Sequence, residues 1–162
     1  GLVALDFIKC EGVHILIDLG TNGEMAIGNK KKILVTSTAA GPAFEGGNIS
    51  SGIGSVAGAL NKATLTEGKI KYETIMGAPL VGICGSGVVE LTHELLKSGL
   101  VDETGLMDEA YFDEGYSLDK TVTGSMVKFT QKDVREIQLA KSAIRAGLEM
   151  RKFILQVALD IT

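Results

Sequence analysis

Residues 13–37 read VHILIDLGTNGEMAIGNKKKILVTS, and this stretch decides the fold that the sequence predicts. It begins with the largely apolar run Val13–Leu19, which is bounded by glycines and is typical of a buried strand. The turn at 20–23 contains Asn-Gly, a strong hairpin signal, and Glu24–Ile27 then alternates polar and apolar residues as a returning strand does. After a second turn, Ile33–Ser37 is rich in β-branched residues. The sequence therefore predicts a three-stranded antiparallel meander.

The chain then passes from glycine-rich loops to helices. Residues 38–63 are small and glycine-rich, and we expect a loop there, followed by a short or broken helix near Ser50–Leu60. Residues 69–75 are expected to form an edge strand. The apolar spacing within Val88–Leu96 predicts a helix that stops near Gly99.

A long helix is predicted to start at Gln131. Thr130 offers an N-cap, and Asp133 resembles the partner residue of a capping box. Gly147 is expected to bend this helix. Its buried stripe is expected to comprise Val134, Ile137, Ala140, Ile144 and Leu148.

Residues 102–119 form an acidic segment, with seven carboxylates and no lysine or arginine. Outside it the chain has 13 acidic and 16 basic residues, so the acidity of the chain resides in this segment. We interpret it as a solvated insertion within the domain. The alternative is that the segment, which includes Tyr111, Phe112 and Tyr116, docks a protein partner.

The composition excludes several classes of protein. The chain has 162 residues, 45% of them hydrophobic, and a net charge of -4, as a soluble domain with one core would have. No apolar run approaches the roughly 18 residues of a membrane span, and no basic stripe suggests nucleic-acid binding. Cys10 and Cys84 lie 74 positions apart, which does not suit a zinc site and predicts free thiols in a cytoplasmic protein.

Two glycine-rich segments are candidates for binding an anion. Asp18 followed by the turn at 20–23 brings a carboxylate, a hydroxyl and backbone N–H groups to one point, which suits a metal–phosphate group. An ordinary hairpin in which Asp18 binds its own turn explains the same residues equally well. The stretch 82–87, GICGSG, opens a helix whose first N–H groups favour an anion. The sequence contains no GxxxxGK[ST] motif, so neither segment is a P-loop.

Four blocks of sequence together resemble a known family. They are Asp18–Glu24 (DLGTNGE), Ser37–Gly46 (STAAGPAFEG), Gly82–Gly87 (GICGSG) and Thr130–Lys141 (TQKDVREIQLAK). In this order they resemble the C-terminal domain of the reductive activators of corrinoid proteins, which belong to the superfamily of acetate and sugar kinases, heat-shock chaperones and actin (ASKHA). The resemblance implies an α/β fold, a ribonuclease-H-like or actin-like ATPase subdomain with a mixed sheet flanked by helices.

The resemblance also implies a function and a set of site residues. Such activators use ATP to drive an electron onto the cobalt of a corrinoid protein, which returns it from Co(II) to Co(I). By position, Asp18 would lie near Mg²⁺ or its water, and Glu45 would be a water-positioning carboxylate at the catalytic centre. The nucleotide-binding residues would be Gly20, Thr21, Asn22 and Gly23 at the phosphates, Gly85, Ser86 and Gly87 along the cleft, and Gln138 and Lys141 near the adenosine.

By the same resemblance, residues 1–162 are expected to be one subdomain of a longer protein, inactive when isolated. The family's ferredoxin-like domain with its 2Fe-2S cluster and its first ASKHA subdomain would belong to the remainder of the chain, since two separated cysteines cannot hold the cluster here. The expected partners are that remainder and a corrinoid protein, and a homodimer is open. Two alternatives stay open: a small-molecule kinase of the superfamily, and a non-catalytic module switched by nucleotide.

Overall fold

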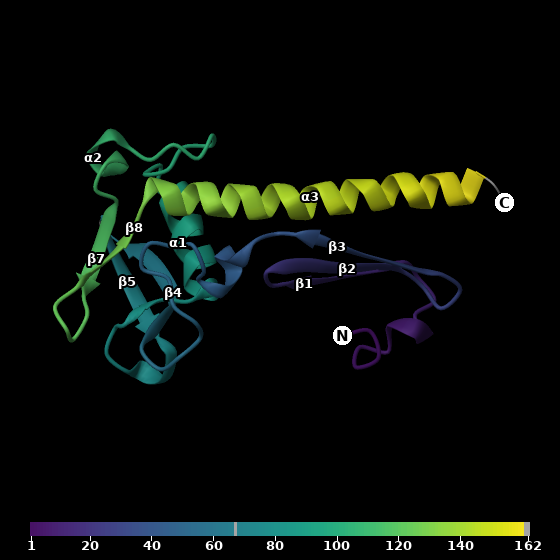
Figure 1. Ribbon diagram of the computed structural model, residues 1–162, viewed down its shortest axis with the longest axis horizontal. Helices are drawn as coiled ribbons and strands as arrows, with labels where there is room; N and C mark the ends of the chain where they lie inside the picture. Colours follow the sequence, from purple (N-terminus) through teal and green to yellow (C-terminus); the bar gives the residue numbers. More distant parts are fainter. Residues whose placement is uncertain (67, 161–162) are drawn as a thin grey trace. The chain divides into compact units, whose positions relative to one another are not determined.

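The computed structural model of the protein describes residues 1–66 and 68–160, with side chains described up to residue 150. The chain divides into two compact units, whose helices and strands are labelled in Figure 1. Unit 1 comprises Gly1–Ala40 and the chain from Leu139 onward, and unit 2 comprises Gly41–Gln138. Unit 2 is therefore inserted in sequence within unit 1.

Unit 1 is built on the predicted three-stranded meander. Its strands are β1 (His14–Leu19), β2 (Asn22–Gly28) and β3 (Ile33–Ala39), in the antiparallel order β1-β2-β3. The long helix α3 (Gln131–Asp160) belongs to this unit from Leu139 onward and packs on one face of the sheet. The meander is confirmed. A short 3-10 turn, η1 (Phe7–Lys9), precedes it and buries Phe7.

Strand β1 is not buried as its apolar sequence predicts. Ile15 and Leu19 are 56% and 48% exposed, and no residue of β1 is fully buried. The reason is topological: β1 is the edge strand of the described sheet, paired only with β2. Its other edge and much of both faces are uncovered among the described residues, which is unusual for so apolar a strand.

Unit 2 contains a mixed sheet with one helix on it. Its strands are β4 (Ala59–Thr66), β5 (Lys69–Thr74) and β6 (Gly82–Ile83), in the order β5-β4-β6, with β4 antiparallel to β5 and parallel to β6. Helix α1 (Gly85–Lys97) follows β6 and packs on β4. Gly99 has a φ of 76°, as a residue just beyond a helix end often does. The predicted edge strand, helix and stop are confirmed.

The helix predicted near Ser50–Leu60 is wrong. Residues 50–58 form turns and bends, and β4 begins at Ala59. Gly58 has a φ of 85°, which a helix cannot accommodate, and any side chain there would overlap the carbonyl oxygen of Pro79. The single helical turn in this part of the chain is the 3-10 turn η2 (Pro42–Glu45).

The acidic segment 102–119 is an ordered part of unit 2. It contains the short helix α2 (Glu109–Phe112) and leads into a hairpin of β7 (Tyr116–Lys120) and β8 (Met126–Phe129). The ring of Tyr116 is buried, and its hydroxyl donates to the carbonyl of Gly68 at 3.3 Å. Several carboxylates have local structural roles, because Asp108 caps α2 and Glu114 pairs with Lys128 at 2.8 Å. The segment is therefore only partly a solvated insertion.

Asp133 fixes the start of α3. Its Oδ2 accepts from the Thr130 N–H at 2.7 Å, and the Thr130 hydroxyl accepts in return from the Asp133 N–H at 3.4 Å. The predicted capping pair is confirmed. The other carboxylate oxygen, Oδ1, accepts from the N–H and the hydroxyl of Ser50 at 2.7 and 3.0 Å, and the side chain is fully buried. One carboxylate thus joins α3 to a loop 83 residues earlier in the chain.

The predicted stripe of α3 is buried in its first half. Val134, Ile137 and Ala140 are buried, whereas Ile144 and Leu148 are half-buried. The helix is continuous through Gly147, where we predicted a bend. A Cβ at this position would lie 2.5 Å from Cε of Met25 and 2.6 Å from Cγ2 of Thr38, so the glycine serves close packing on the sheet.

We expect Asp133→Ala to lower the free energy of unfolding by about 1–3 kcal/mol, because it leaves the partly buried N–H groups of Ser50 and Thr130 without their acceptor. Urea unfolding followed by circular dichroism measures the change. The exposed neighbour Lys132 provides the control. Lys132→Ala should stay within about 0.5 kcal/mol of the wild type, and an equal loss in both variants would contradict the role of the carboxylate.

Glu94 makes stability depend on acid pH. Its buried carboxylate accepts from the N–H of Leu65 at 2.7 Å, and this bond, together with the charge of Lys97, lowers the pKa of Glu94. Because the pKa of Glu94 is lower in the folded than in the unfolded state, its ionised carboxylate stabilises the fold above the ordinary glutamate pKa of about 4.3. It is lost as the pH falls through the lowered pKa.

Glu94→Gln should therefore remove part of the acid dependence of stability. We expect the unfolding free energy of the variant to fall less than that of the wild type below about pH 4.3. Denaturant unfolding over a pH series measures this. Glu90→Gln, an exposed change on the same helix, should retain the wild-type dependence of the unfolding free energy on pH. The same pH dependence in all three proteins would contradict the role of Glu94.

Candidate functional site

The residues predicted to bind nucleotide are divided between the two units. Those in unit 1 are Asp18, Gly20, Thr21, Asn22, Gly23 and Lys141. Those in unit 2 are Glu45, Gly85, Ser86, Gly87 and Gln138. Within each unit, most of them lie at the ends of strands or at the start of a helix.

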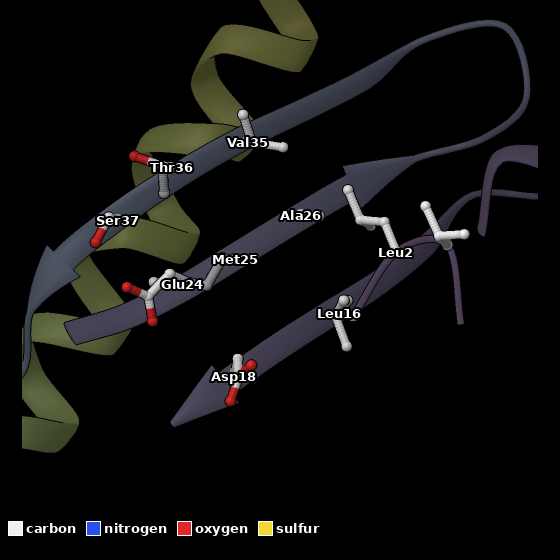
Figure 2. Close-up of a pocket in the computed structure, with 11 residues that line it drawn as sticks. Leu2, Leu16, Asp18, Glu24, Met25, Ala26, Val35, Thr36 and Ser37 are labelled. Carbon is white, nitrogen blue, oxygen red and sulfur yellow. The ribbon is translucent and has the colours of Figure 1, made fainter. Parts of the chain in front are cut away.

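In unit 1, a polar row crosses the sheet at the end of β1. Asp18 lies directly opposite Glu24 on β2, and Glu24 lies opposite Ser37 on β3. Figure 2 shows the two carboxylates on neighbouring strands, with the hydroxyl of Ser37 on the third. Directly opposed like charges repel each other. The three side chains of the row carry oxygen atoms of the kind that Mg²⁺ takes as ligands.

An apolar pocket of about 660 Å³ lies beside this polar row. Figure 2 shows part of its lining, with Leu16 on the same strand as Asp18, Val35 on the same strand as Ser37, and Leu2 from the chain before the sheet. The pocket is on the sheet face that carries Asp18, whereas Gly23 and Met25 on the opposite face pack against α3. The open face of the sheet thus combines an apolar surface with an acidic end.

The hairpin loop after Asp18 is shorter than predicted. Leu19 pairs with Gly23 and β2 begins at Asn22, so only Gly20 and Thr21 lie between the strands, and the N–H of Gly20 bonds to the carbonyl of Asn22 at 3.1 Å. Gly23 is already in β2 and does not have a positive φ. A Cβ there would lie 3.2 Å from Cγ1 of Ile144, so this glycine allows the hairpin to approach α3 closely.

In unit 2, the start of α1 lies against the turn that carries Glu45. A Cβ on Gly85 would overlap the carbonyl oxygen of Phe44, the residue before Glu45, and one on Gly87 would overlap that of Leu60. Ser86 between them is exposed. The structure therefore brings Glu45 and the 85–87 segment together, and it does so by backbone contact that only glycine permits.

Cys84 precedes α1 and is a packed thiol. It is fully buried, and its Sγ donates to the carbonyl of Leu60 at 3.1 Å. Its side chain does not cap the helix. The first turn of α1 therefore keeps N–H groups that could meet an anion.

Gln138 is committed to unit 2 through its side chain. Its amide donates to the carbonyl of Thr104 at 2.7 Å and accepts from Arg135 at 2.6 Å. Two helical turns earlier, Gln131 accepts from the N–H of Met107 at 2.7 Å. The first turns of α3 thus hold the start of the acidic segment. Lys141 is exposed on the same helix, and its proposed role near adenosine stays a prediction.

Sequence reasoning missed Glu24 and the contacts between α3 and the acidic segment. The position of Glu24 follows from the hairpin register, since pairing Leu19 with Gly23 places Asp18 opposite Glu24. No local signal predicts the hydrogen bonds of Gln131, Arg135 and Gln138, because their partners are backbone groups about 30 residues earlier.

The described residues contain neither a cluster that could hold a metal ion nor a helix that could cross a membrane. No three His, Cys, Asp or Glu side chains within that part of the chain are grouped to hold a metal ion. Cys10 and Cys84 are free thiols that belong to different units. None of the helices in the described residues combines the length and the apolar character that a bilayer crossing requires.

Comparison with known proteins relates the chain to one family. Residues 12–160 match the family described as the C-terminal domain of RACo, the ASKHA domain. The chain is 37% identical, over 90% of its length, to the corrinoid activation enzyme RamQ of Eubacterium limosum, of which it covers 28%. It is 31% identical, also over 90% of its length, to the Co(II) methylated amine-specific corrinoid protein reductase of Methanosarcina barkeri, of which it covers 29%.

A solved structure gives the same relation. The chain resembles a reductive activator for corrinoid, iron-sulfur protein with a TM-score of 0.88 and 31% sequence identity, over 96% of this chain and 27% of that one. The chain thus spans little more than a quarter of these relatives. The expected α/β fold, with a mixed sheet and flanking helices, is confirmed.

We expect Gly85→Ala to lower the unfolding free energy by about 1–3 kcal/mol, because the added methyl overlaps a backbone carbonyl and must displace the turn that carries Glu45. Gly54→Ala is the matched control, since Gly54 has nothing within 4 Å and no positive φ. It should be neutral or slightly stabilising. Thermal unfolding of both variants measures the difference. Equal stability of the two variants would contradict the close contact between Gly85 and the carbonyl of Phe44.

Proposed function

Because the chain belongs to the family of the RACo C-terminal ASKHA domain, we propose that it is the nucleotide-binding part of an ATP-dependent reductive activator. The full-length protein would return a corrinoid protein from Co(II) to Co(I). The observation that carries this proposal is the family match over residues 12–160, which includes the hairpin of Asp18 and the turn of Glu45. Both relatives named above are enzymes of corrinoid activation or reduction.

We propose that the hairpin of unit 1 binds the phosphates of ATP together with Mg²⁺. Asp18 would hold the ion or its water, with Glu24 beside it, and the donors of Thr21 and of the loop backbone would face the phosphates. The residues present fit this role, because two opposed carboxylates favour a divalent cation between them. Bound ATP would supply the free energy for moving the electron to a lower potential.

In unit 2, we assign Glu45 to the positioning of water and the 85–87 segment to the nucleotide cleft. The support is local: Gly85 abuts the carbonyl before Glu45, so the carboxylate and the start of α1 are held as one piece. The first N–H groups of α1 and the helix dipole favour a negatively charged group at this point.

We propose that other parts of the full-length protein supply the electron and provide the second subdomain of the nucleotide-binding site. A 2Fe-2S cluster takes about four protein ligands, and the two cysteines of this chain, in separate units, do not fit one. The exposure of the apolar edge strand β1 also supports this proposal, because an apolar edge is usually covered by another part of the protein. Free thiols fit a cytoplasmic location, and a homodimer of the full-length protein remains a proposal.

The decisive experiment uses the full-length protein, its corrinoid protein, a reductant and ATP, with Co(I) followed by its absorption. We expect Co(I) to form only with ATP. Asp18→Asn should slow its formation by about 100-fold, the usual effect of losing a group that stabilises transition-state charge. Asp6→Asn makes the same chemical change at an exposed carboxylate of the same unit and should leave the rate unchanged. ATP-independent or absent Co(I) formation by the wild type would overturn the proposal.

A further inference from the structure

The loop that follows Glu45 is closed by contact between its two ends. It comprises residues 46–53 and begins at Gly46, whose φ of 79° lies in the left-handed region. A Cβ on Gly46 would lie 2.5 Å from the carbonyl oxygen of Ile53, and a Cβ on Gly52 would overlap the carbonyl oxygen of Gly46. The backbones at the two ends therefore touch in a way that only glycine permits. Glu45 directly precedes this contact, so its position depends on where the end of the loop lies.

The end of the loop pairs with the strand that leads into α1. The N–H of Ile53 donates to the carbonyl of Ile83 at 2.9 Å, and the N–H of Ile83 donates to that of Ser51 at 2.8 Å. Gly85, two residues after Ile83, lies against the carbonyl of the residue before Glu45. The backbone on both sides of Glu45 is thus held by this pair of segments.

The middle of the loop is bound by side-chain hydrogen bonds to a different part of unit 2. The N–H and the hydroxyl of Ser50 both donate to Oδ1 of Asp133, at 2.7 and 3.0 Å. The hydroxyl of Ser51 accepts from the backbone N–H of Lys128 in β8 at 2.9 Å. Lys128 and Asp133 lie on either side of the junction between β8 and α3. This junction therefore determines where the loop lies.

The burial of Asp133 goes beyond what the cap of α3 requires. A capping pair uses one oxygen of its acidic residue, and burying a carboxylate is costly unless hydrogen bonds replace its hydration. Asp133 is fully buried, and it directs one oxygen to Thr130 and the other to Ser50. Because a carboxylate group is planar and rigid, these bonds fix the distance between the loop and α3. Surface loops are otherwise among the more mobile parts of a protein.

We propose that Asp133, acting through Ser50, is a positioning residue that holds the Glu45 carboxylate in place for the hydrolysis of ATP. This inference rests on the proposed function, in which Glu45 positions the attacking water. In that step the water oxygen bonds to the γ-phosphorus, and the bond from this phosphorus to the bridging oxygen breaks with its electron pair remaining on ADP. One water proton is released with inorganic phosphate. A displacement of about 1 Å in such a group can slow a reaction by about 100-fold, so the connection to Asp133 affects the rate rather than the binding of ATP.

The test measures ATP hydrolysis by the full-length protein, with kcat and KM for ATP determined separately. Ser50→Ala removes the hydroxyl bond to Asp133 but keeps the backbone bond, and Asp133→Asn leaves one accepting oxygen for two N–H donors. We expect kcat to fall about threefold in Ser50→Ala and about tenfold or more in Asp133→Asn, with KM within about twofold of the wild type. Ser50→Thr, which retains the hydroxyl, should rescue kcat. Ser98→Ala is the matched control, since it removes a hydroxyl bond to the Leu95 carbonyl at the other end of α1 and should leave kcat unchanged.

Glu45→Gln separates a positioning role from a general structural one. If Asp133 acts through Glu45, Glu45→Gln alone lowers kcat, and adding Ser50→Ala or Asp133→Asn lowers it no further. A disturbance that slows hydrolysis by another route would lower kcat by the same factor with and without Glu45→Gln. Rates are measured at a temperature where circular dichroism shows each variant to be folded, and Ser50→Ala remains as the test if Asp133→Asn does not fold.

Three results overturn the inference. One is an equal loss of kcat with and without Glu45→Gln, and another is an unchanged kcat in the folded variants of Ser50 and Asp133. The third is a wild-type kcat in Glu45→Gln, because Asp133 is proposed to act through that carboxylate. Failure of the wild type itself to hydrolyse ATP, or to form Co(I) with ATP, overturns the proposed function instead.

Discussion

The buried carboxylate of Asp133 is the interaction on which the arrangement of unit 2 most depends. A helix leaves its first N–H groups without partners, and a partly buried loop N–H that lies outside a sheet also needs an acceptor. One side chain satisfies both groups, because one oxygen of Asp133 accepts from the N–H of Thr130 and the other from the N–H of Ser50. It therefore determines where α3 starts, and it ties the glycine-rich loop that precedes β4 to the same point.

The parts of the fold that follow from local rules could be predicted from the sequence. The meander, α1 with its stop at Gly99, and the capping pair at the start of α3 each depend on residues within a few positions of one another. The failures depend on distant partners. Residues 50–58 are non-helical because Gly58 must pass close to the carbonyl of Pro79, and the exposure of β1 depends on which strands lie beside it.

The candidate site shows the same division. The motifs alone predict Asp18 and the glycines as site residues. The position of Glu24 opposite Asp18 follows from the register of the hairpin. The contact of Gly85 with the turn of Glu45 and the engagement of Gln138 with Thr104 required the structure. Glycine is abundant in the chain, at 21 of 162 residues. Gly85 shows one reason, because a Cβ there would overlap a backbone carbonyl, whereas Gly23 and Gly147 allow close contacts between side chains of the sheet and α3.

Helix α3 is shared by the two units, and this has a consequence for how the chain folds. Its first turns are part of unit 2, where Asp133, Val134 and Ile137 are buried, and the helix continues without interruption into unit 1. Starting a helix is far less favourable than extending one. Once the capped first turn has formed, growth of the helix into unit 1 needs no second nucleation, so the order gained in one unit lowers the entropic barrier in the other. Because unit 2 ends inside a helix that continues into unit 1, the stability of each unit depends on the other. The two units should therefore unfold in a single cooperative transition.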